Sequence, residues 1–503
     1  MIEAFAQVFE LQTLLLVFLG VFLGVLFSAI PGLTATMGIA LLIPYTFSLP
    51  QVPALGMLLG IYIGGMYGGA ITAILIRTPG TPSAAATLLD GYPMAAKGQA
   101  GKALNFATIA SFVGGIISCV ILILVAPQLA SFGLKFGPAE FFALAVFGLS
   151  IVGTISGKHA IKGMVIAALG LLIATVGMDP IGGVPRFTFG SINLTSGVSF
   201  IPALIGLFAV SQVIKEVEEK VKGSQQKKIK FQRERISLKE HFSYWKDYLR
   251  SSLIGTFIGI IPGTGTSIAT FLSYNESKRF AKKERKKEYG TGIPEGVIAS
   301  ESSNNAVTGG ALVPLLTLGI PGDVVTAVIL GGLMIQGVTP GPLLFQNNGT
   351  LVNSLFITLI IANIFMLLIG LFAVRFVGKI VDVPKNILLP IVVTLCFIGS
   401  YSLSNNLFDV WIALVFGVIG FLLEKFNYPL APLILGIILG PIIESNLRRT
   451  VIESSGDLSV LFTRPISGIF LTIAIVSFVF PLLKSLWNRF KGNEEEDDSS
   501  LSA

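Results

Sequence analysis

Long apolar runs, separated by short polar or glycine-rich stretches, recur along most of the chain. A helix needs about 20 apolar residues to cross the hydrocarbon core of a bilayer. By that measure the pattern predicts an all-α polytopic membrane protein with about eleven full crossings. The predicted crossings are 54–76, 105–126, 139–156, 161–178, 199–214, 302–320, 351–374, 386–403, 407–424, 428–443 and 465–487.

Composition narrows the class of protein. Hydrophobic residues make up 53% of the 503 residues and charged residues only 13%, whereas a soluble domain carries about 25% charged residues. Such a chain has too little polar surface for a soluble enzyme, a disordered chain or a nucleic-acid binder. Cys119 and Cys396 lie inside apolar runs, and His159 and His241 are far apart. We therefore expect no disulfide framework, no firm metal site and no cofactor.

The positions of Lys and Arg predict the orientation of the chain. Residues 1–76 contain none, whereas 215–250 and 278–287 are dense in them. Cytoplasmic loops hold the excess of Lys and Arg. We therefore expect the N-terminus outside, the C-terminus inside, a basic cytoplasmic linker at 215–250 and an acidic cytoplasmic tail at 488–503. The net charge of +7 is then a sign of topology rather than of nucleic-acid binding.

Two pairs of segments indicate an internal duplication. Residues 20–40 and 251–273 share a glycine that stands six positions before an Ile-Pro-Gly triplet. Residues 68–91 and 309–332 both begin Gly-Gly-Ala and reach a Pro-Gly pair about ten residues later. The partners are about 231 residues apart in the first pair and about 242 in the second. Two matches in the same order favour a repeat over chance.

In the orientation predicted from Lys and Arg, the equivalent crossings 105–126 and 351–374 pass through the membrane in opposite directions. We therefore expect an inverted repeat. Inverted repeats are a transporter architecture, with the substrate near mid-membrane between discontinuous helices. The eleven crossings agree with an outside N-terminus and an inside C-terminus only if two segments with central Pro-Gly breaks enter and leave the membrane on the same side, as re-entrant hairpins. The predicted parts are a first membrane repeat at 1–214 (re-entrant 12–48, break at 79–80), the linker 215–250, a second membrane repeat at 251–443 (re-entrant 251–273, break at 321–322), a last loop and span at 444–487, and the tail.

Four Pro-Gly pairs interrupt apolar segments, and a new helix follows each pair. The first turn of such a helix presents free N–H groups and the positive end of the helix dipole, which together bind anions. Hydroxyl residues cluster at the same places. They are either substrate ligands or ordinary N-caps and packing residues. The predicted substrate-binding residues are Pro31, Gly32, Thr34, Thr36, Pro79, Gly80, Thr81, Ser83, Pro262, Gly263, Thr264, Gly265, Thr266, Ser267, Pro321 and Gly322.

A second set of polar residues suits a cation. Ionisable groups inside a membrane segment are costly and are functional candidates by default. Oxygen-rich clusters of low charge suit Na⁺, although a capped helix start explains the same residues. The candidate cation-coupling residues are Glu301, Ser302, Asn304, Asn305 and Asp323. Arg77, two residues before a break, either pairs with an anionic substrate or extends to the cytoplasmic surface.

Three strings carry a resemblance to a known family. They are GIYIGGMYGGAITAILIRTPGTPSAAATLLDGYPMAAKGQAGKAL (60–104), IPGTGTSIATFLSY (261–274) and PEGVIASESSNNAVTGGALVPLLTLGIPGDVVTAVILGGLMIQGVTPGP (294–342). With them the chain resembles the TctA family, the large membrane subunit of the tripartite tricarboxylate transporters.

The resemblance implies a secondary transporter in the bacterial inner membrane. It would import citrate-like or other organic carboxylates, driven by a gradient of Na⁺ or H⁺. It would work with an extracytoplasmic solute-binding protein and a small membrane subunit.

Two other classes remain as alternatives. One is an organic-anion transporter that works without a binding protein. The other is an intramembrane enzyme, which is disfavoured because no H-E-x-x-H motif or metal-ligand constellation occurs in the sequence. The sequence also lacks a G-x-x-x-x-G-K-[ST] loop, so we expect no ATP binding and no enzymatic activity.

Overall fold

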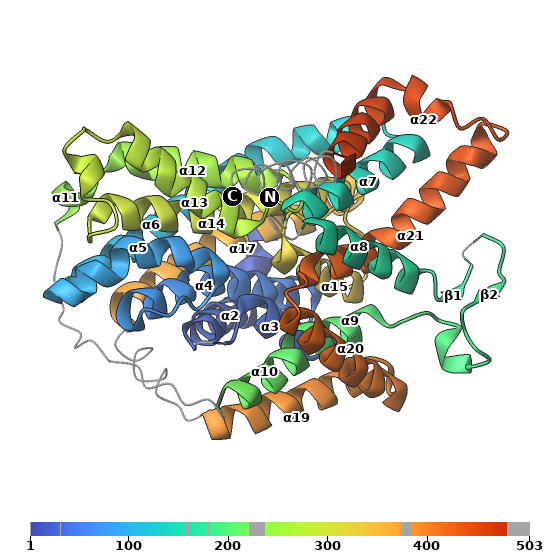
Figure 1. Ribbon diagram of the computed structural model, residues 1–503, viewed down its shortest axis with the longest axis horizontal. Coiled ribbons are helices and arrows are strands. Elements are labelled where there is room, and N and C mark those ends of the chain that lie inside the picture. The colour runs from blue at the N-terminus through green and yellow to red at the C-terminus, as the bar shows by residue number, and fades with distance from the viewer. Residues whose placement is uncertain are drawn as a thin grey trace, which may run out of the picture. The chain divides into compact units, whose positions relative to one another are not determined.

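The computed structural model describes residues 2–30, 32–155, 160–179, 181–220, 237–373 and 385–479. Helices dominate this part of the chain, and one antiparallel pair of two-residue strands accompanies them (Figure 1). The predicted all-α class is therefore confirmed. Pro31, residues 221–236 of the predicted linker 215–250 and the tail 488–503 lie outside the described residues.

Chain order gives the following elements, with η marking short 3₁₀ and π turns. The first half contains α1 (Ile2–Val8), α2 (Leu11–Ala29), α3 (Ala35–Thr46), α4 (Gln51–Ile76), η1 (Pro82–Ala84), α5 (Ala85–Met94), η2 (Ala95–Gln99), α6 (Ala100–Gly133), α7 (Pro138–Ile155), α8 (Ala160–Ala174), β1 (Gly177–Met178), β2 (Pro185–Arg186), η4 (Ile192–Leu194), α9 (Phe200–Leu204), η5 (Ile205–Val210) and α10 (Ser211–Lys220). The second half contains α11 (Leu238–Ser243), α12 (Trp245–Ile260), α13 (Gly265–Phe280), η6 (Arg285–Lys287), α14 (Pro294–Leu318), α15 (Val324–Ile335), α16 (Pro342–Asn347), α17 (Gly349–Leu368), η7 (Ile369–Ala373), α19 (Lys385–Ser404), α20 (Leu407–Lys425), α21 (Leu430–Glu453) and α22 (Val460–Thr463).

Seven described helices are long and apolar enough to cross a membrane, and six further apolar helices are shorter. The chain is therefore a multi-pass membrane protein. Residues 302–318 of the predicted crossing 302–320 belong to α14, which ends at Leu318 and whose residues from Gly296 to Thr317 are all buried. The number of crossings and the two re-entrant hairpins stay predictions. Because α2 has 19 residues, it is long enough to span.

The described chain divides into two compact units. Unit 1 comprises residues 1–134 and 199–421, and unit 2 comprises 135–198 and 422–503. Each unit contains segments from both predicted repeats. The two compact units therefore do not coincide with the two predicted repeats. The repeat boundaries at 1–214 and 251–443 stay a prediction from the sequence.

Matching contacts inside unit 1 support the duplication. In the first half α2 packs on α4, and in the second half α12 packs on α14 (Figure 1). A Cβ atom built on Gly24 would lie 2.3 Å from the carbonyl oxygen of Ile61, and one on Gly255 would lie 2.3 Å from that of Ser303. These residues differ by 231 and 242 positions, the offsets read from the sequence. Both helix pairs thus need a glycine for the same close backbone approach.

The breaks repeat the pattern. A Cβ on Gly80 would lie 2.9 Å from the Cα of Gly69, and a Cβ on Gly322 would lie 2.6 Å from the Cα of Ala311. In each half, the later of the two breaks (79–80 or 321–322) therefore folds back onto the helix that precedes it. The offset is again 242 for both members, so the two halves share local geometry as well as sequence.

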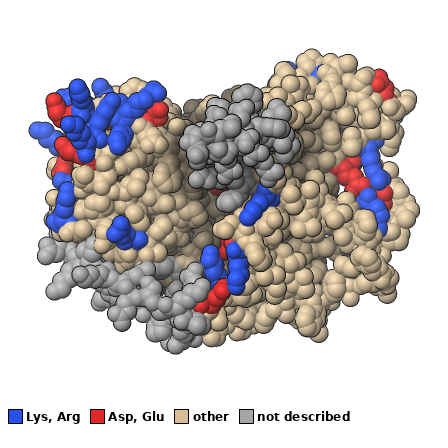
Figure 2. All heavy atoms as spheres, in the orientation of Figure 1, with Lys and Arg blue, Asp and Glu red and all other residues tan. Residues whose placement is uncertain are grey.

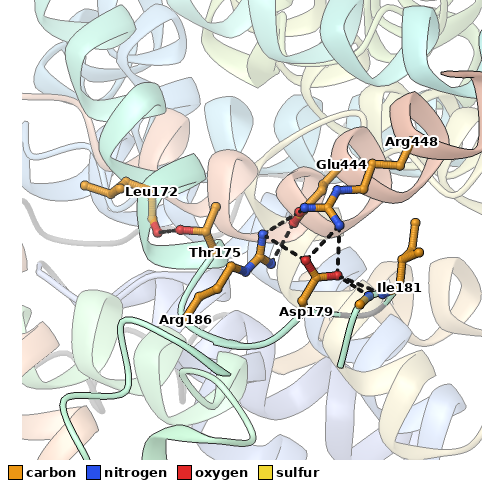
Figure 3. Close-up of polar contacts among 8 residues, drawn as sticks. Leu172, Thr175, Asp179, Ile181, Arg186, Glu444 and Arg448 are labelled. Carbon is orange, nitrogen blue, oxygen red and sulfur yellow. Dashed lines mark hydrogen bonds and ion pairs between the residues drawn. The ribbon is translucent and has the colours of Figure 1, made fainter. Parts of the chain in front are cut away.

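Unit 2 is held at one end by an ion cluster between the β1–β2 loop and α21 (Figure 3). Arg186 donates two hydrogen bonds to Glu444, at 2.6 and 3.0 Å, and Arg448 donates two to Asp179, at 2.9 and 2.7 Å. The backbone N–H groups of Ile181 and Gly182 also donate to Asp179, each at 2.8 Å. These N–H donors first, and Arg448 next, lower the pKa of Asp179 to about 2.

Lys and Arg gather on one part of unit 1, over α11 to α13 and the loop that follows α13 (Figure 2). The density of Lys and Arg predicts that this loop is cytoplasmic, together with the linker 215–250. The structure starts α12 at Trp245, so that helix begins within the predicted linker. The exposed basic residues of the patch are Lys239, Lys246, Lys278, Arg279, Lys282, Lys283 and Lys287.

Candidate functional site

The first break separates α2 from α3. Gly32 has a φ of +95°, a conformation that favours glycine. Thr34 is the N-cap of α3, and its Oγ1 accepts a hydrogen bond from the Met37 N–H at 3.2 Å. The predicted N-cap alternative is therefore correct for Thr34. Since its oxygen accepts that bond, the hydroxyl proton remains available to a ligand.

The second break separates α4 from η1 and α5. The N–H of Gly80 donates to the carbonyl of Gly69. Thr81 caps η1 by accepting from the Ala84 N–H at 3.4 Å, and its hydroxyl lies 3.0 Å from that of Ser83. One hydroxyl proton joins these two side chains, so the other proton can still be donated to a ligand.

The third break separates α12 from α13 and touches the fourth. The N–H of Gly263 donates to the carbonyl of Gly322 at 2.8 Å. Thr264 turns its hydroxyl back onto α12, with the carbonyl oxygens of Ile258 and Ile261 at 2.6 and 2.9 Å. Its single proton is thereby used, so Thr264 has no proton to donate to a substrate.

The fourth break separates α14 from α15. Asp323 caps α15 through a capping box with Thr326, whose N–H donates to Asp323 Oδ1 at 2.7 Å. The hydroxyl of Tyr62, on α4, donates to Asp323 Oδ2 at 2.8 Å. The predicted cap at Asp323 is therefore observed, and its carboxylate is buried. Sequence reasoning missed Tyr62, because 261 residues separate the two side chains.

The helices that follow the breaks pair across the two halves. Helix α13 packs on η1 and α5, and helix α3 packs on α15. We name the first combination the neutral break pair (breaks 79–80 and 262–263) and the second the acidic break pair (breaks 31–32 and 321–322). Thr81 and Asp323 are 242 residues apart and stand at equivalent places, so only one of the two pairs carries a carboxylate.

The neutral break pair suits an anion. Besides the shared proton of Thr81 and Ser83, the half-buried side chains of Thr266 and Ser267 take part in no hydrogen bond within the described residues. Thr36, in the acidic pair, is likewise without a bond there. Arg77 does not join either pair. It is exposed, and its guanidinium stacks over the ring of Tyr92, 5.5 Å from the centroid.

The candidate cation residues form one polar stretch on α14. Glu301, Ser302, Asn304 and Asn305 are each 0% exposed. The side-chain oxygens of Ser302, Asn304 and Asn305 have no hydrogen-bond partner in the described structure. Unsatisfied buried polar atoms are costly, and they indicate a place where a ligand, ion or water belongs. Asp323 lies apart from this stretch, in the acidic break pair.

Glu301 has partners from two other helices. Its Oε1 accepts a short hydrogen bond from Thr87 on α5, and its Oε2 accepts one from Ser111 on α6 at 3.0 Å. Among the described residues, no three or more His, Cys, Asp or Glu side chains are placed so that they could hold a metal ion together. A hollow of about 480 Å³, bounded by α1, the start of α4 and the α16–α17 turn, includes none of the predicted site residues.

The comparisons with known proteins agree with this architecture. The model of the tripartite tricarboxylate transporter TctA family matches residues 14–435. A protein of Agrobacterium vitis, described as "Uncharacterized 52.8 kDa protein in TAR-I ttuC' 3'region", is 39% identical over 491 residues, 95% of both chains. A second protein of that organism, "Uncharacterized protein in TAR-II ttuC' 3'region", is 37% identical over 244 residues, which are 48% of this chain and all of that protein. No solved structure matches. Since the family match covers most of the chain, this protein belongs to the tripartite tricarboxylate transporter TctA family.

Proposed function

We propose that the chain imports an organic carboxylate of the citrate-like type, coupled to a gradient of Na⁺ or H⁺. An extracytoplasmic solute-binding protein would deliver the substrate, and a small membrane subunit would complete the transporter. Membership of a transporter family supports transport rather than enzymatic activity. The N-terminus would lie outside and the C-terminus inside the inner membrane.

The observation that carries the proposal is the neutral break pair. A di- or tricarboxylate brings two or three negative charges into a region of low dielectric, where unpaired charge is prohibitive. Helix α13 offers the positive end of its dipole there, equivalent to roughly half an elementary charge. Hydroxyl donors of Thr266, Ser267 and the Thr81–Ser83 pair stand at the same helix starts. The acidic break pair would repel the same substrate through Asp323.

Uptake into proteoliposomes tests the proposal. The chain would be reconstituted with the small subunit, and candidate carboxylates would be added with purified binding protein under separate Na⁺ and pH gradients. We expect accumulation that requires the binding protein. Equal accumulation without binding protein would favour a transporter that works alone. No accumulation of any carboxylate under either gradient would contradict the proposal.

A further inference from the structure

Glu301 is buried in a way that the fold itself does not require. The equivalent of Glu301 in the first half, 242 positions earlier, is Leu59, and the equivalent of Thr87 is Ile329. Leu59 and Ile329 line one small apolar cavity together with Leu355 and Leu359 of α17. Helix α17 corresponds to α6, which carries Ser111. The same place in the other half is therefore lined by hydrocarbon side chains alone, so a carboxyl group is not needed for packing.

The described surroundings leave the charge of Glu301 without a cationic partner. Two hydroxyl donors do not neutralise an ionised carboxylate in such an interior, where an uncompensated charge is costly, so uptake of a cation or a proton is favoured. Charged side chains of the neighbouring helices form ion pairs with residues other than Glu301. Lys102 of α6 pairs with Glu240, Arg250 of α12 with Asp247, Arg279 of α13 with Glu276, and Glu295 of α14 with Arg285.

Three further ionisable groups of the neighbouring elements are uncharged or satisfied. Tyr67 of α4, which interacts electrostatically with Glu301, exchanges a hydrogen bond with Thr108. Asp90, one turn after Thr87 on α5, accepts hydrogen bonds from Tyr274 of α13 and from three backbone N–H groups. Asp323, which caps α15, is bound by Tyr62 and Thr326. Neither η1 nor α16 contains an ionisable residue.

Direct hydrogen bonds favour a proton over a metal ion at this site. A hard cation takes roughly six oxygen ligands around it. Here each carboxylate oxygen of Glu301 receives a hydroxyl directly, one from Thr87 and one from Ser111. A proton added to either oxygen needs only one acceptor, and a hydroxyl oxygen supplies it after rotating its own proton away.

We propose that Glu301 is the proton-carrying group of this transporter, present once per chain because only the second half has it. The inference rests on the proposed function. When the carboxylate takes a proton from hydronium on one side, an O–H bond of hydronium breaks, water is left, and the carboxyl O–H bond forms. That bond breaks when the proton passes to a water molecule on the other side, which becomes hydronium. Thr87 joins this site to the neutral break pair, because η1 and α5 run directly from Thr81 to Thr87. Asn304 lies one turn after Glu301, and its Oδ1 is without a partner there.

The test replaces Glu301 by glutamine, which keeps the shape of a protonated carboxyl and cannot release the proton. The full transporter in proteoliposomes would be assayed for accumulation under a pH gradient and for exchange without a gradient. We expect the ratio of accumulation to exchange to fall by roughly 5- to 150-fold, the range of a linkage free energy. Glu453→Gln, an exposed carboxyl of α21, is the matched control. An unchanged ratio in Glu301→Gln would overturn the proposal.

A second measurement does not depend on substrate or partners. Infrared difference spectra of the purified chain, recorded between two pH values, should contain a protonated-carboxyl band that Glu301→Gln lacks. Ser111→Ala, which removes one hydroxyl donor, should shift the pH midpoint of that band. Absence of any band lost in Glu301→Gln overturns the proton site, and so does accumulation that responds to Na⁺ and not to pH. If wild-type protein transports no carboxylate, the proposed function fails, and the spectra still decide the role of Glu301.

Discussion

The third break offers a sharp test, because its two threonines have different roles in the structure. The sequence assigned both Thr264 and Thr266 to the substrate. The Thr264 hydroxyl is committed to the carbonyls of Ile258 and Ile261, whereas the Thr266 hydroxyl has no partner among the described residues. Valine has the shape of threonine and lacks the hydroxyl. Thr264→Val should therefore affect folding stability, and Thr266→Val should affect substrate affinity.

The magnitudes follow from the lost hydrogen bonds. Thr266→Val removes one hydrogen bond to a charged carboxylate, worth about 1.5–3 kcal/mol, so affinity should fall between tenfold and somewhat more than a hundredfold. Thr264→Val removes the hydroxyl donor from two part-buried carbonyl oxygens that keep their backbone N–H donors, which should cost about 0.5–1.5 kcal/mol of stability. Substrate affinity would be measured by concentration-dependent uptake, and stability by thermal unfolding in detergent. Loss of affinity in Thr264→Val with unchanged stability, together with a silent Thr266→Val, would refute the reasoning.

Three further predictions concern packing, pH and topology. Gly255→Ala should destabilise unit 1 by about 1–3 kcal/mol, because its new methyl group meets a backbone carbonyl at 2.3 Å, whereas Gly349→Ala, with nothing within 4 Å, should unfold at the wild-type temperature. The depressed pKa of Asp179, about 2, means that its ion cluster stabilises unit 2 above the unfolded pKa of about 3.9 and loses this effect as pH falls toward 2; Asp179→Asn should flatten that pH dependence in thermal unfolding, and an equally steep curve would contradict the assignment. Gln225→Cys and Lys283→Cys should both resist an impermeant thiol reagent added from outside; reaction of only one of them would show that segment 251–273 crosses the membrane completely.

Sequence reasoning succeeded where the signal is local. Apolar run length identifies the membrane helices, and a Pro-Gly pair marks each helix end because proline removes a donor and glycine accepts an unusual φ. The caps at Thr34 and Asp323 follow from residue type and position alone. The 231- and 242-residue offsets were also readable, and the same glycines make the equivalent contacts.

The rest depends on which helices meet. Thr87 and Ser111 bind Glu301 across 214 and 190 residues of sequence. Many other hydroxyl residues occur in the apolar helices, and nothing in the sequence distinguishes these two as partners of a carboxylate. Likewise, nothing in the pattern near Thr264 distinguishes a hydroxyl that turns back from one that faces a cavity. The division into two units was unpredictable for the same reason, since each unit combines helices from both halves.

The difference between α4 and α14 has a consequence for the resting state of the protein. A transporter made of two identical inverted copies would have inward-open and outward-open forms of equal free energy, because exchanging the two copies converts one form into the other. Here one copy carries Leu59 and the other Glu301 at the equivalent place, so the exchange is no longer neutral. Each 1.4 kcal/mol of inequality changes the ratio of the two forms by about tenfold. Under the proposed inverted-repeat mechanism, the empty carrier has a preferred side, and ionisation of the Glu301 carboxyl group shifts the ratio of the two forms.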